Sequence, residues 1–346
     1  MRQQTRVWCD GCFDIVHYGH ANSFRQARQL GDVLVVGVHN DEEITANKGP
    51  PLFVEEERYR MVKAVKWVDE VIEGSTYWPT VHTLDENNCQ FAAHGDDLSI
   101  SLDGRDPYQA LRDAGRLKIF KRTEGVSTTD IIERILAAAQ DHHEATSVSS
   151  LQNGLAKEFR SPWTKMSQFL LSSNKIVQFS EGKEPRSGDK IVYVSGGWDV
   201  FHPGHADFLE AASKEGDYLI VGIHPDSVLH EKRGSNYPIL NLHERTLSVL
   251  ACRYVSEVVI GAPYEILADT LAQLKIDVVC AGPTVLPKTT VDPYLEAKKQ
   301  GKFKVIDTGN KLTTKDIVAR VRNNRHRFET RNTKKEKREY ESFQTD

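Results

Sequence analysis

The chain carries one short sequence pattern twice, and this repeat limits its fold more than any other feature. The pattern Gly-x-x-Asp-x-x-His-x-Gly-His spans residues 11–20 and again residues 196–205. Aligning residues 7–41 with residues 192–226 at a constant shift of 185 gives 15 identities in 35 positions, among turn, polar and apolar residues alike. A period this long exceeds the roughly 20–50 residues of solenoid repeats. The sequence therefore predicts two tandem domains.

The length of 346 residues leaves room for two domains of about 150 residues, each able to bury its own core. We predict a first domain over residues 1–140, a linker over 141–189, a second domain over 190–330 and a charged tail over 331–346. The linker is rich in serine, glycine and polar residues. It also contains apolar side chains, so we expect part of it to dock on the domains.

Composition excludes several classes of protein. A net charge of -4 gives no global field for binding nucleic acid or an anionic membrane. No apolar run approaches the roughly 18 residues that span a bilayer, so at most a peripheral membrane contact is expected. The first residues are polar and lack the apolar core of a signal peptide. Five cysteines form no disulfide framework, and reduced thiols in the cytoplasm are expected.

Strands and helices alternate in both copies. In the first copy, a predicted strand over Arg6–Cys9 leads through a loop to a helix over Gly19–Leu30. The continuous apolar run Val33–His39 is typical of a central parallel strand that is buried on both faces. The order repeats from a strand over Ile191–Val194 onward. This alternation predicts an α/β chain with two tandem Rossmann-like, doubly wound parallel sheets, whose ligands bind beyond the carboxyl ends of the strands.

Two histidines flank one glycine at the predicted start of a helix in each copy. In the first copy, His17 and His20 come next to the backbone N–H groups of the first helical turn, a place that favours anions. Gly19 lets a phosphate approach the backbone, and imidazole N–H groups can donate to it. The alternative is that these side chains only cap the helix. Their occurrence in two matching contexts favours two phosphate-handling sites.

A second anion-type segment, Lys121–Asp130, precedes another apolar helix. Ser127 and the aspartate three residues later have capping-box spacing, so part of this segment starts the helix. Arg122 and Gly125 exceed what a cap needs. Together with Lys48 in Asn-Lys-Gly-Pro, they predict positive charge around a polyphosphate.

Together these motifs resemble the cytidylyltransferases of phospholipid synthesis, a family of the HxGH nucleotidyltransferase superfamily. The resemblance is carried by Cys-Asp-Gly-Cys-Phe-Asp-Ile-Val-His-Tyr-Gly-His, Asn-Lys-Gly, Glu-Arg at 57–58, Trp-Val-Asp-Glu-Val at 67–71 and Arg-Thr-Glu-Gly-Val-Ser-Thr at 122–128. It covers nearly the whole chain, and the tandem arrangement looks like the members that act on phosphoethanolamine. The resemblance implies an enzyme that transfers CMP from CTP to phosphoethanolamine, giving CDP-ethanolamine and pyrophosphate with Mg²⁺.

The resemblance also implies roles for individual residues. The implied catalytic residues are His17, His20, Lys48 and Arg122. The implied CTP-binding residues are Gly11, Cys12, Phe13, Gly19, His20, His94, Gly95, Asp96, Thr123, Gly125, Ser127 and Thr128. The implied phosphoethanolamine-binding residues are Asp10, Lys48, Tyr77, Trp78 and Tyr108. No side chain is expected to hold a metal, because Mg²⁺ would arrive with CTP.

The second copy predicts a weaker site. Its candidate residues are Gly196, Gly197, His202, Gly204, His205, Arg233, Thr313 and Thr314. Thr308 replaces the arginine of the polyphosphate segment, and Ser195 stands where the first copy has Asp10. We therefore expect the first domain to perform the main reaction and the second to be a specialised or regulatory nucleotide site. Because relatives of this family are dimers, we also expect an internal pseudo-dimer of the two copies, and the chain could form a homodimer.

Two other functions stay open. Asp10 and its aromatic neighbours could also accept the quaternary ammonium of phosphocholine by charge and cation–π contact. The tandem layout and the lack of an amphipathic membrane helix favour ethanolamine. The alternative of another class is a non-catalytic nucleotide sensor or scaffold, which the intact Lys48 and Arg122 disfavour. A tRNA synthetase is disfavoured too, because the chain has no Lys-Met-Ser-Lys-Ser type loop and no surplus positive charge for RNA.

Overall fold

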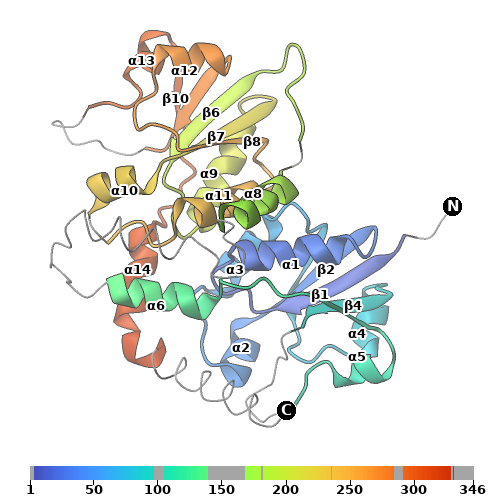
Figure 1. Ribbon diagram of the computed structural model, residues 1–346. Helices are drawn as coiled ribbons and strands as arrows, with labels where there is room; N and C mark the ends of the chain where they lie inside the picture. Colours follow the sequence, from blue (N-terminus) through green and yellow to red (C-terminus); the bar gives the residue numbers. More distant parts are fainter. Residues whose placement is uncertain are drawn as a thin grey trace.

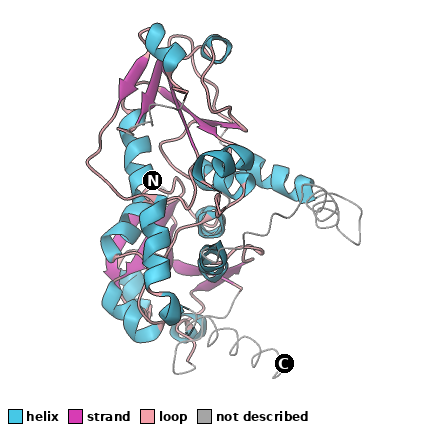
Figure 2. Cartoon of the chain, turned by 90° about the vertical axis from the view of Figure 1, so that its left-hand side faces the viewer, coloured by secondary structure: helices cyan, strands magenta, loops and turns pink. Residues whose placement is uncertain are grey.

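The computed structural model describes residues 4–96, 105–138, 168–180, 182–234, 236–283, 291–328 and 330. Within these residues the chain forms two all-parallel, five-stranded sheets, each flanked by helices, one above the other in Figures 1 and 2. The predicted fold class is therefore confirmed. The predicted tail and residues 141–167 of the predicted linker lie outside the described residues.

The first sheet has the strand order β3-β2-β1-β4-β5. Its strands are β1 (Arg6–Gly11), β2 (Val33–His39), β3 (Glu70–Ser75), β4 (Phe91–Gly95) and β5 (Leu117–Phe120). Its helices are α1 (Tyr18–Arg28), α2 (Asp41–Asn47), α3 (Glu55–Lys63), α4 (Val81–Glu86), α5 (Gln109–Asp113) and α6 (Thr128–Ala138). The central strands β1 and β2 pair in parallel over six residues of each and are buried along most of their length, as their apolar sequence predicts.

The second sheet repeats this arrangement with the strand order β10-β9-β6-β7-β8. Its strands are β6 (Ile191–Gly196), β7 (Tyr218–Ile223), β8 (Glu257–Ile260), β9 (Val278–Ala281) and β10 (Phe303–Val305). Its helices are α9 (Pro203–Ser213), α10 (Asp226–Arg233), α11 (Leu242–Leu250), α12 (Ala268–Gln273), α13 (Leu295–Lys299) and α14 (Thr314–Asn323). The strand order reverses beside β1 and beside β6, so the repeated sequence pattern follows the strand at each topological switch point.

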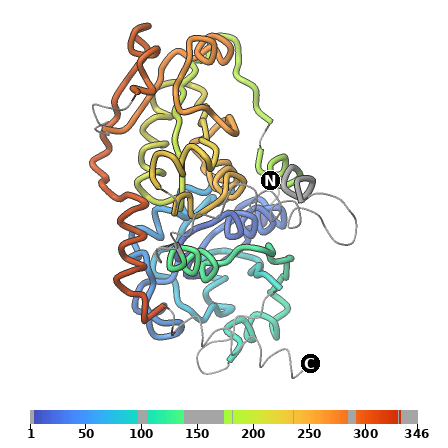
Figure 3. Tube along the Cα trace, turned by 60° about the vertical axis from the view of Figure 1, so that its left-hand side comes forward, coloured from blue at the N-terminus to red at the C-terminus, as the bar shows by residue number. Residues whose placement is uncertain are grey.

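The two domains pack on each other through equivalent elements. Lys66 N donates to Ala251 O at 2.9 Å, and Arg253 N donates to Ala64 O at 2.9 Å, on either side of an isolated antiparallel bridge. Helix α6 packs on its counterpart α14, which runs down beside the first domain (Figures 1 and 3). Buried apolar side chains of both domains form one continuous cluster. The contacts therefore have the isologous pattern of a two-fold symmetric dimer.

Helix α8 (Gln168–Phe179) connects to both domains at the end of the linker. Phe179 is fully buried, and its ring meets the ring of Trp67 edge-on at a centroid distance of 4.9 Å. The ammonium group of Lys66 donates to the carbonyl of Phe179. Since α8 also packs on α11 of the second domain, it covers part of the junction between the domains.

Candidate active site

The loop that carries the repeated pattern has strained backbone in both domains. Phe13 and Ile15 adopt φ angles of 50° and 54°, and their counterparts Trp198 and Val200 adopt 55° and 46°. Left-handed backbone is costly for bulky and β-branched residues, so it persists only where the surrounding structure enforces it. The same strain in both copies shows that each loop is shaped by its neighbours.

A buried carboxylate in the repeated pattern holds each loop. Asp14 accepts hydrogen bonds from the backbone N–H groups of Leu52 and Phe53 at 3.0 and 2.9 Å. Asp199 makes the two equivalent bonds in the second domain at 2.8 and 2.9 Å. Charge-assisted bonds of this kind are stronger than neutral ones. The aspartate of the pattern is therefore a structural residue that fixes the loop before the histidines.

A buried arginine adds to this support. Arg58 donates to the carbonyls of His39 at 2.6 Å and Cys12 at 2.9 Å, and to the Asp41 carboxylate at 2.8 Å. It therefore joins the β1–α1 loop to the segment that follows β2. Arg245 makes the corresponding contacts in the second domain. The Glu-Arg dipeptide of the sequence analysis thus contributes a scaffold residue in each copy.

The two histidines of the first copy lie on the opening turn of α1 with stacked rings. Their centroids are 3.9 Å apart. His17 is the N-cap, and its Nδ1 accepts the Gly19 N–H at 3.1 Å, while Nδ1 of His20 accepts the His17 N–H at 3.4 Å. A ring nitrogen that accepts an N–H carries no proton, so the proton of each neutral ring is on Nε2. The capping interpretation is therefore confirmed for Nδ1, and it is compatible with the predicted role of Nε2–H as a donor to an anion.

The charge state of His17 follows from its surroundings. Burial lowers the pKa of His17 well below its usual value, and the nearby His20 and Arg122 lower this pKa further. The imidazole is therefore neutral at pH 7. A Cβ added to Gly19 would lie 2.8 Å from the His17 ring and from Val126, so only glycine allows this ring placement.

A buried carboxylate lies at the carboxyl end of β1. Tyr108 Oη donates to Asp10 Oδ1 at 3.1 Å, whereas Asp10 Oδ2 is buried and has no hydrogen-bond partner among the described residues. Burial raises the pKa of Asp10 to about 7, with Tyr108, Trp8 and Lys48 opposing the shift. Buried polar atoms are rarely left without a partner, so Oδ2 is suited to a cationic ligand.

The aromatic candidates near this carboxylate differ in their placement. Tyr77 is buried, the Lys48 ammonium lies 5.8 Å from the centre of its ring, and both interact electrostatically with Asp10. The partly exposed Trp78 lies under the guanidinium of Arg105, 4.7 Å from its ring centre. Tyr77 therefore belongs to the group around Asp10, and Trp78 lies beside it with a ring centroid 5.9 Å away.

His39 belongs to the same group and was not predicted from the sequence. Its Nε2 lies 3.9 Å from Asp10 Oδ2, and its Nδ1 donates to the Ser75 carbonyl at 3.1 Å. Burial lowers the pKa of His39 to about 4, so the ring is neutral and places no positive charge beside Asp10. The sequence feature that could have pointed to His39 is the recurrence of this histidine as His224, directly after β7.

Arg122 lies close enough to His17 to act on its charge. Its backbone N–H donates to Asp96 Oδ1 at 2.8 Å, and its charge contributes to the lowered pKa of His17. Gly125 follows in a turn with a φ of 80°, which favours glycine. Asp96 is thus a support for the polyphosphate segment.

The hydroxyl groups of the polyphosphate segment make internal bonds. Thr123 accepts from the Asn22 side chain at 2.8 Å, and Ser127 caps α6 by accepting a backbone N–H at 3.1 Å. Thr128 donates to the Asp14 carbonyl at 2.8 Å, which joins the start of α6 to the strained loop. The N-termini of α1 and α6 are therefore held by the same loop, and their N–H groups suit an anion.

The remaining predicted residues surround these two helix starts. The Phe13 ring lies edge-on to His20 at 5.5 Å, and a Cβ on Gly11 would lie 3.0 Å from that ring. At the end of β4, His94 lies 4.4 Å from the Tyr108 ring and its Nδ1 donates to the Gly95 carbonyl at 2.9 Å. The half-buried Cys12 contributes its carbonyl to the arginine scaffold.

The second site keeps the histidines but loses several partners. The rings of His202 and His205 stack at 3.7 Å, yet Nδ1 of each has no hydrogen bond among the described residues. No side chain caps α9. Burial lowers the pKa of His202 to about 3, and Arg233 lowers it further. Register with β6 places Ala281 where the first domain has His94. These histidines therefore have no fixed donor nitrogen, in contrast to those of α1.

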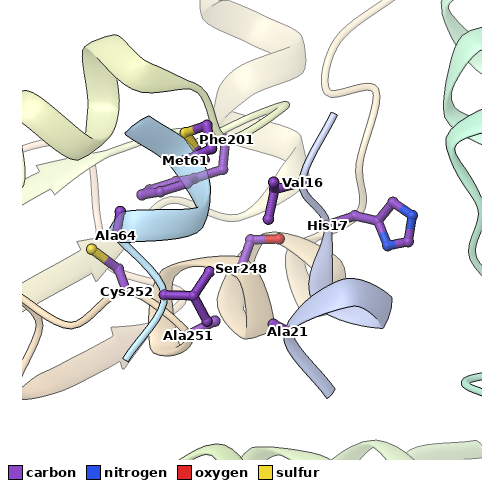
Figure 4. A pocket seen from close by; sticks show the side chains of 10 residues that line it. Val16, His17, Ala21, Met61, Ala64, Phe201, Ser248, Ala251 and Cys252 are labelled. Carbon is purple, nitrogen blue, oxygen red and sulfur yellow. The ribbon is translucent and has the colours of Figure 1, made fainter. Parts of the chain in front are cut away.

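A small apolar cavity lies at the domain junction behind His17. Its volume is about 20 Å³, room for about one water molecule. Figure 4 shows Met61 of the first domain and Phe201 of the second near its wall, and the His17 imidazole turned away from it. The cavity therefore lies away from the His17 imidazole and is too small for a substrate.

Within the described ranges, no group of three or more His, Cys, Asp or Glu side chains could hold a metal ion. The groups that surround the two helix N-termini are imidazoles, a guanidinium and backbone N–H donors. These groups fit the phosphate oxygens of a nucleotide better than a bare cation.

Most of the chain matches one protein family. The cytidylyltransferase-like family matches residues 8–134 and again residues 193–336, which together cover most of both sheets. The chain therefore belongs to the cytidylyltransferase-like family and carries two copies of its domain.

Within that family, the chain is similar over nearly its whole length to ethanolamine-phosphate cytidylyltransferases and over part of it to choline-phosphate cytidylyltransferases. Ethanolamine-phosphate cytidylyltransferase of Mus musculus is 50% identical over 363 residues, which cover 97% of this chain and 90% of that protein. The protein of the same name from Dictyostelium discoideum is 50% identical over 346 residues, covering 98% of this chain and 96% of that protein. Choline-phosphate cytidylyltransferase A of Mus musculus is 41% identical over 134 residues, 38% of this chain. Both copies of the domain are thus matched by the ethanolamine-phosphate relatives.

Proposed function

We propose that this chain transfers CMP from CTP to phosphoethanolamine, giving CDP-ethanolamine and pyrophosphate. The observation that carries the proposal is the unpartnered, buried Oδ2 of Asp10 at the same sheet edge as the donor histidines of α1. One end of this arrangement suits an ammonium group and the other suits phosphates. Full-length relatives named for this reaction support it.

The chemistry is a direct displacement. A phosphate oxygen of phosphoethanolamine attacks the α-phosphorus of CTP, the bond from that phosphorus to the bridging α–β oxygen breaks, and pyrophosphate leaves with the electron pair. The chain's own groups position the reactants and offset charge. Nε2–H of His17 and His20 would donate to phosphate oxygens as charge develops there. Lys48 would lie between the α-phosphate and the incoming phosphate.

The leaving pyrophosphate needs a second set of donors. Arg122 and the N-terminal N–H groups of α6 would hold the β and γ phosphates. The internal bonds of Ser127 and Thr128 fix that helix start, so its donors need no rearrangement when CTP binds. We propose that Mg²⁺ enters as the Mg·CTP complex, held by phosphate oxygens and water, and neutralises phosphate charge.

The ammonium pocket favours a primary amine. A primary ammonium has N–H donors that need acceptors, and Asp10 Oδ2 is a buried acceptor without a donor. A quaternary ammonium has no N–H and relies on an aromatic cage. Here Tyr77 already faces the Lys48 ammonium, and Trp78 faces Arg105. We therefore propose ethanolamine over choline.

A substrate panel tests the proposed function. Purified full-length chain is incubated with CTP, Mg²⁺ and one of phosphoethanolamine, its N-methyl, N,N-dimethyl and N,N,N-trimethyl derivatives, and pyrophosphate release is followed. We expect kcat/KM to fall with each added methyl group, by at least about 10²-fold over the series, because a buried acceptor loses its donor. Preference for the trimethyl compound would identify the choline alternative. Retention of CTP with no turnover would support a nucleotide sensor.

Replacing Asp10 by asparagine gives a pH signature. The wild-type kcat/KM for phosphoethanolamine reports the free enzyme, and burial raises the pKa of Asp10 to about 7 there. Below that pH the carboxyl is protonated and attracts an ammonium less, so kcat/KM should rise with pH through about 7. Asp10→Asn should lower kcat/KM about 10²-fold, because the ammonium group loses its charged partner. It should also remove the rise of kcat/KM with pH near 7. The titration of the substrate phosphate is common to both proteins.

The pH dependence of folding stability tests the raised pKa of Asp10 independently of catalysis. The folded pKa of Asp10 lies above the ordinary value of 3.8, so the folded state binds the proton more tightly than the unfolded state. The wild type therefore loses stability as pH rises from about 4 to about 7, and the asparagine variant lacks this loss. Thermal midpoints should differ more at pH 8 than at pH 4. An unchanged pH profile of both kcat/KM and stability would contradict the assigned role.

We propose that the first domain performs this reaction and that the second is a specialised or regulatory nucleotide site. The lack of the Asp10 carboxylate and of fixed donor nitrogens in the second site supports this division. The expected homodimer and the cytoplasmic location stay predictions. Among the described residues, no helix combines the length and apolar composition needed to cross a membrane.

A further inference from the structure

An ion pair connects the helix that would hold the β and γ phosphates in the first domain to the second domain, in addition to the packing of that helix on α14. Arg134 lies on α6, and its Nη1 donates to both carboxylate oxygens of Glu244 at 2.8 Å. Glu244 belongs to α11 of the second domain. Its side chain is 6% exposed, whereas that of Arg134 is 38% exposed. The carboxylate is therefore the fixed, shielded member of the pair.

The same carboxylate acts on the helix that carries the donor histidines. Helix α1 packs on α11. Tyr18 lies between the two histidines in sequence, and burial raises its pKa to about 12, with Glu244 raising it and Arg134 lowering it. Both charges therefore lie close to the first turn of α1. One residue of the second domain thus faces both helices whose N-termini would flank the triphosphate of CTP.

We propose that Glu244 is a positioning residue for the first site, acting across the domain boundary through Arg134 to fix α6 relative to α1. This inference rests on the proposed function, because it assumes that CTP binds between those two helix starts. A small displacement of α6 would move Arg122 and the helix N-terminus away from the phosphates, and displacements of about 1 Å can cost 10²-fold in rate. Glu244 itself contacts no substrate.

The chain contains a matched control for this pair. Arg320 on α14 donates to the two carboxylate oxygens of Glu57 on α3 at 2.6 and 2.8 Å. This is the Arg134–Glu244 contact with the domains exchanged, but here Nη1 and Nη2 each donate to one carboxylate oxygen, whereas Arg134 uses Nη1 alone. The Arg320–Glu57 pair holds α14, the helix of the second site, so breaking it leaves the pair between Arg134 of α6 and Glu244 intact.

The test compares Glu244→Gln with Glu57→Gln in the full-length chain. Glutamine keeps the size of each side chain and can still accept the capping bond that Glu244 receives from Asn241 N at 3.0 Å. We expect Glu244→Gln to raise both the KM and the calorimetric dissociation constant for CTP roughly tenfold, within the usual range of coupling between sites. The KM for phosphoethanolamine should stay unchanged. Glu57→Gln should leave the KM for CTP within about twofold.

A double variant shows whether Glu244 acts through Arg134. Adding Arg134→Gln to Glu244→Gln should weaken CTP binding no further, because the two residues form one interacting pair. Equal effects of Glu244→Gln and Glu57→Gln on CTP affinity would overturn the inference. So would a loss of stability or kcat alone, with both CTP constants unchanged. Failure of the wild type to form CDP-ethanolamine would instead overturn the proposed function, and the CTP dissociation constants would still judge the positioning role.

Discussion

Replacing His17 and His20 together by alanine is expected to lower kcat for CDP-ethanolamine formation by at least about 10³-fold, since one preorganised donor alone is worth 10²–10³. Both rings have a fixed donor nitrogen because their Nδ1 atoms accept backbone N–H groups. Product is quantified by chromatography at saturating CTP and phosphoethanolamine.

The equivalent change in the second domain is the control. His202→Ala combined with His205→Ala removes the same side chains from a site without a fixed donor nitrogen and without the Asp10 carboxylate. We expect the kcat of this variant to stay within roughly tenfold of the wild-type value. A change of that size would reflect coupling between the domains and not the loss of groups that act on the substrates. Comparable losses in both double variants would show that the two domains share the reaction.

Replacing Arg58 by methionine is expected to lower the free energy of unfolding by about 3–5 kcal/mol, the usual cost of breaking a buried, hydrogen-bonded charge network. The residue is 1% exposed, and its guanidinium joins the segments after β1 and β2 through four acceptors. Its loss would remove the donor to three carbonyls and the contacts that hold the strained loop in place. Urea unfolding followed by circular dichroism measures the change.

An exposed arginine provides the comparison for stability. Arg112 makes a surface ion pair with Asp106 at 3.2 Å, and its side chain is 44% exposed. Such pairs contribute about 0–1 kcal/mol, so Arg112→Met should shift the unfolding midpoint little. If the two variants were equally stable, Arg58 would not be the support that the geometry indicates.

The fold could be predicted from the sequence because its signals are local and repeated. The continuous apolar run Val33–His39 is observed as β2 with the predicted bounds. Two short helices were not predicted, α2 and α10, because seven and eight mostly polar residues carry little apolar periodicity. Asn40, which caps α2 through a bond to Glu43 N at 2.8 Å, was the available signal for the first of them.

The site was harder to predict because its geometry depends on long-range contacts. His17 and His20, the proposed phosphate donors, lie within one helical turn and were visible as a motif. The role of His39 depends on Ser75, a residue of the neighbouring strand 36 positions away in the chain. The pairing of Arg134 with Glu244 joins residues 110 positions apart in different domains. Contacts of this kind follow from the register of the sheet and the packing of the domains.

The two copies show how one scaffold can carry unequal sites. The structural residues Asp14 and Arg58 recur with their bonds as Asp199 and Arg245. The residue that would contact the ammonium group does not recur, since Ser195 replaces Asp10. Retention of the scaffold therefore explains the shared fold, and loss of the contact residues predicts the difference in activity.

We propose that the side chains of the first domain position CTP and phosphoethanolamine for direct displacement and form no covalent bond to the nucleotide. The most direct test supplies phosphoethanolamine and a single diastereomer of the CTP analogue in which sulfur replaces a non-bridging oxygen on the α-phosphorus. The configuration at phosphorus in the resulting thio-analogue of CDP-ethanolamine is then determined. One in-line displacement predicts inversion. Retention, which requires two displacements and a nucleotidyl-protein intermediate, would contradict the claim, as would failure to form the product at all.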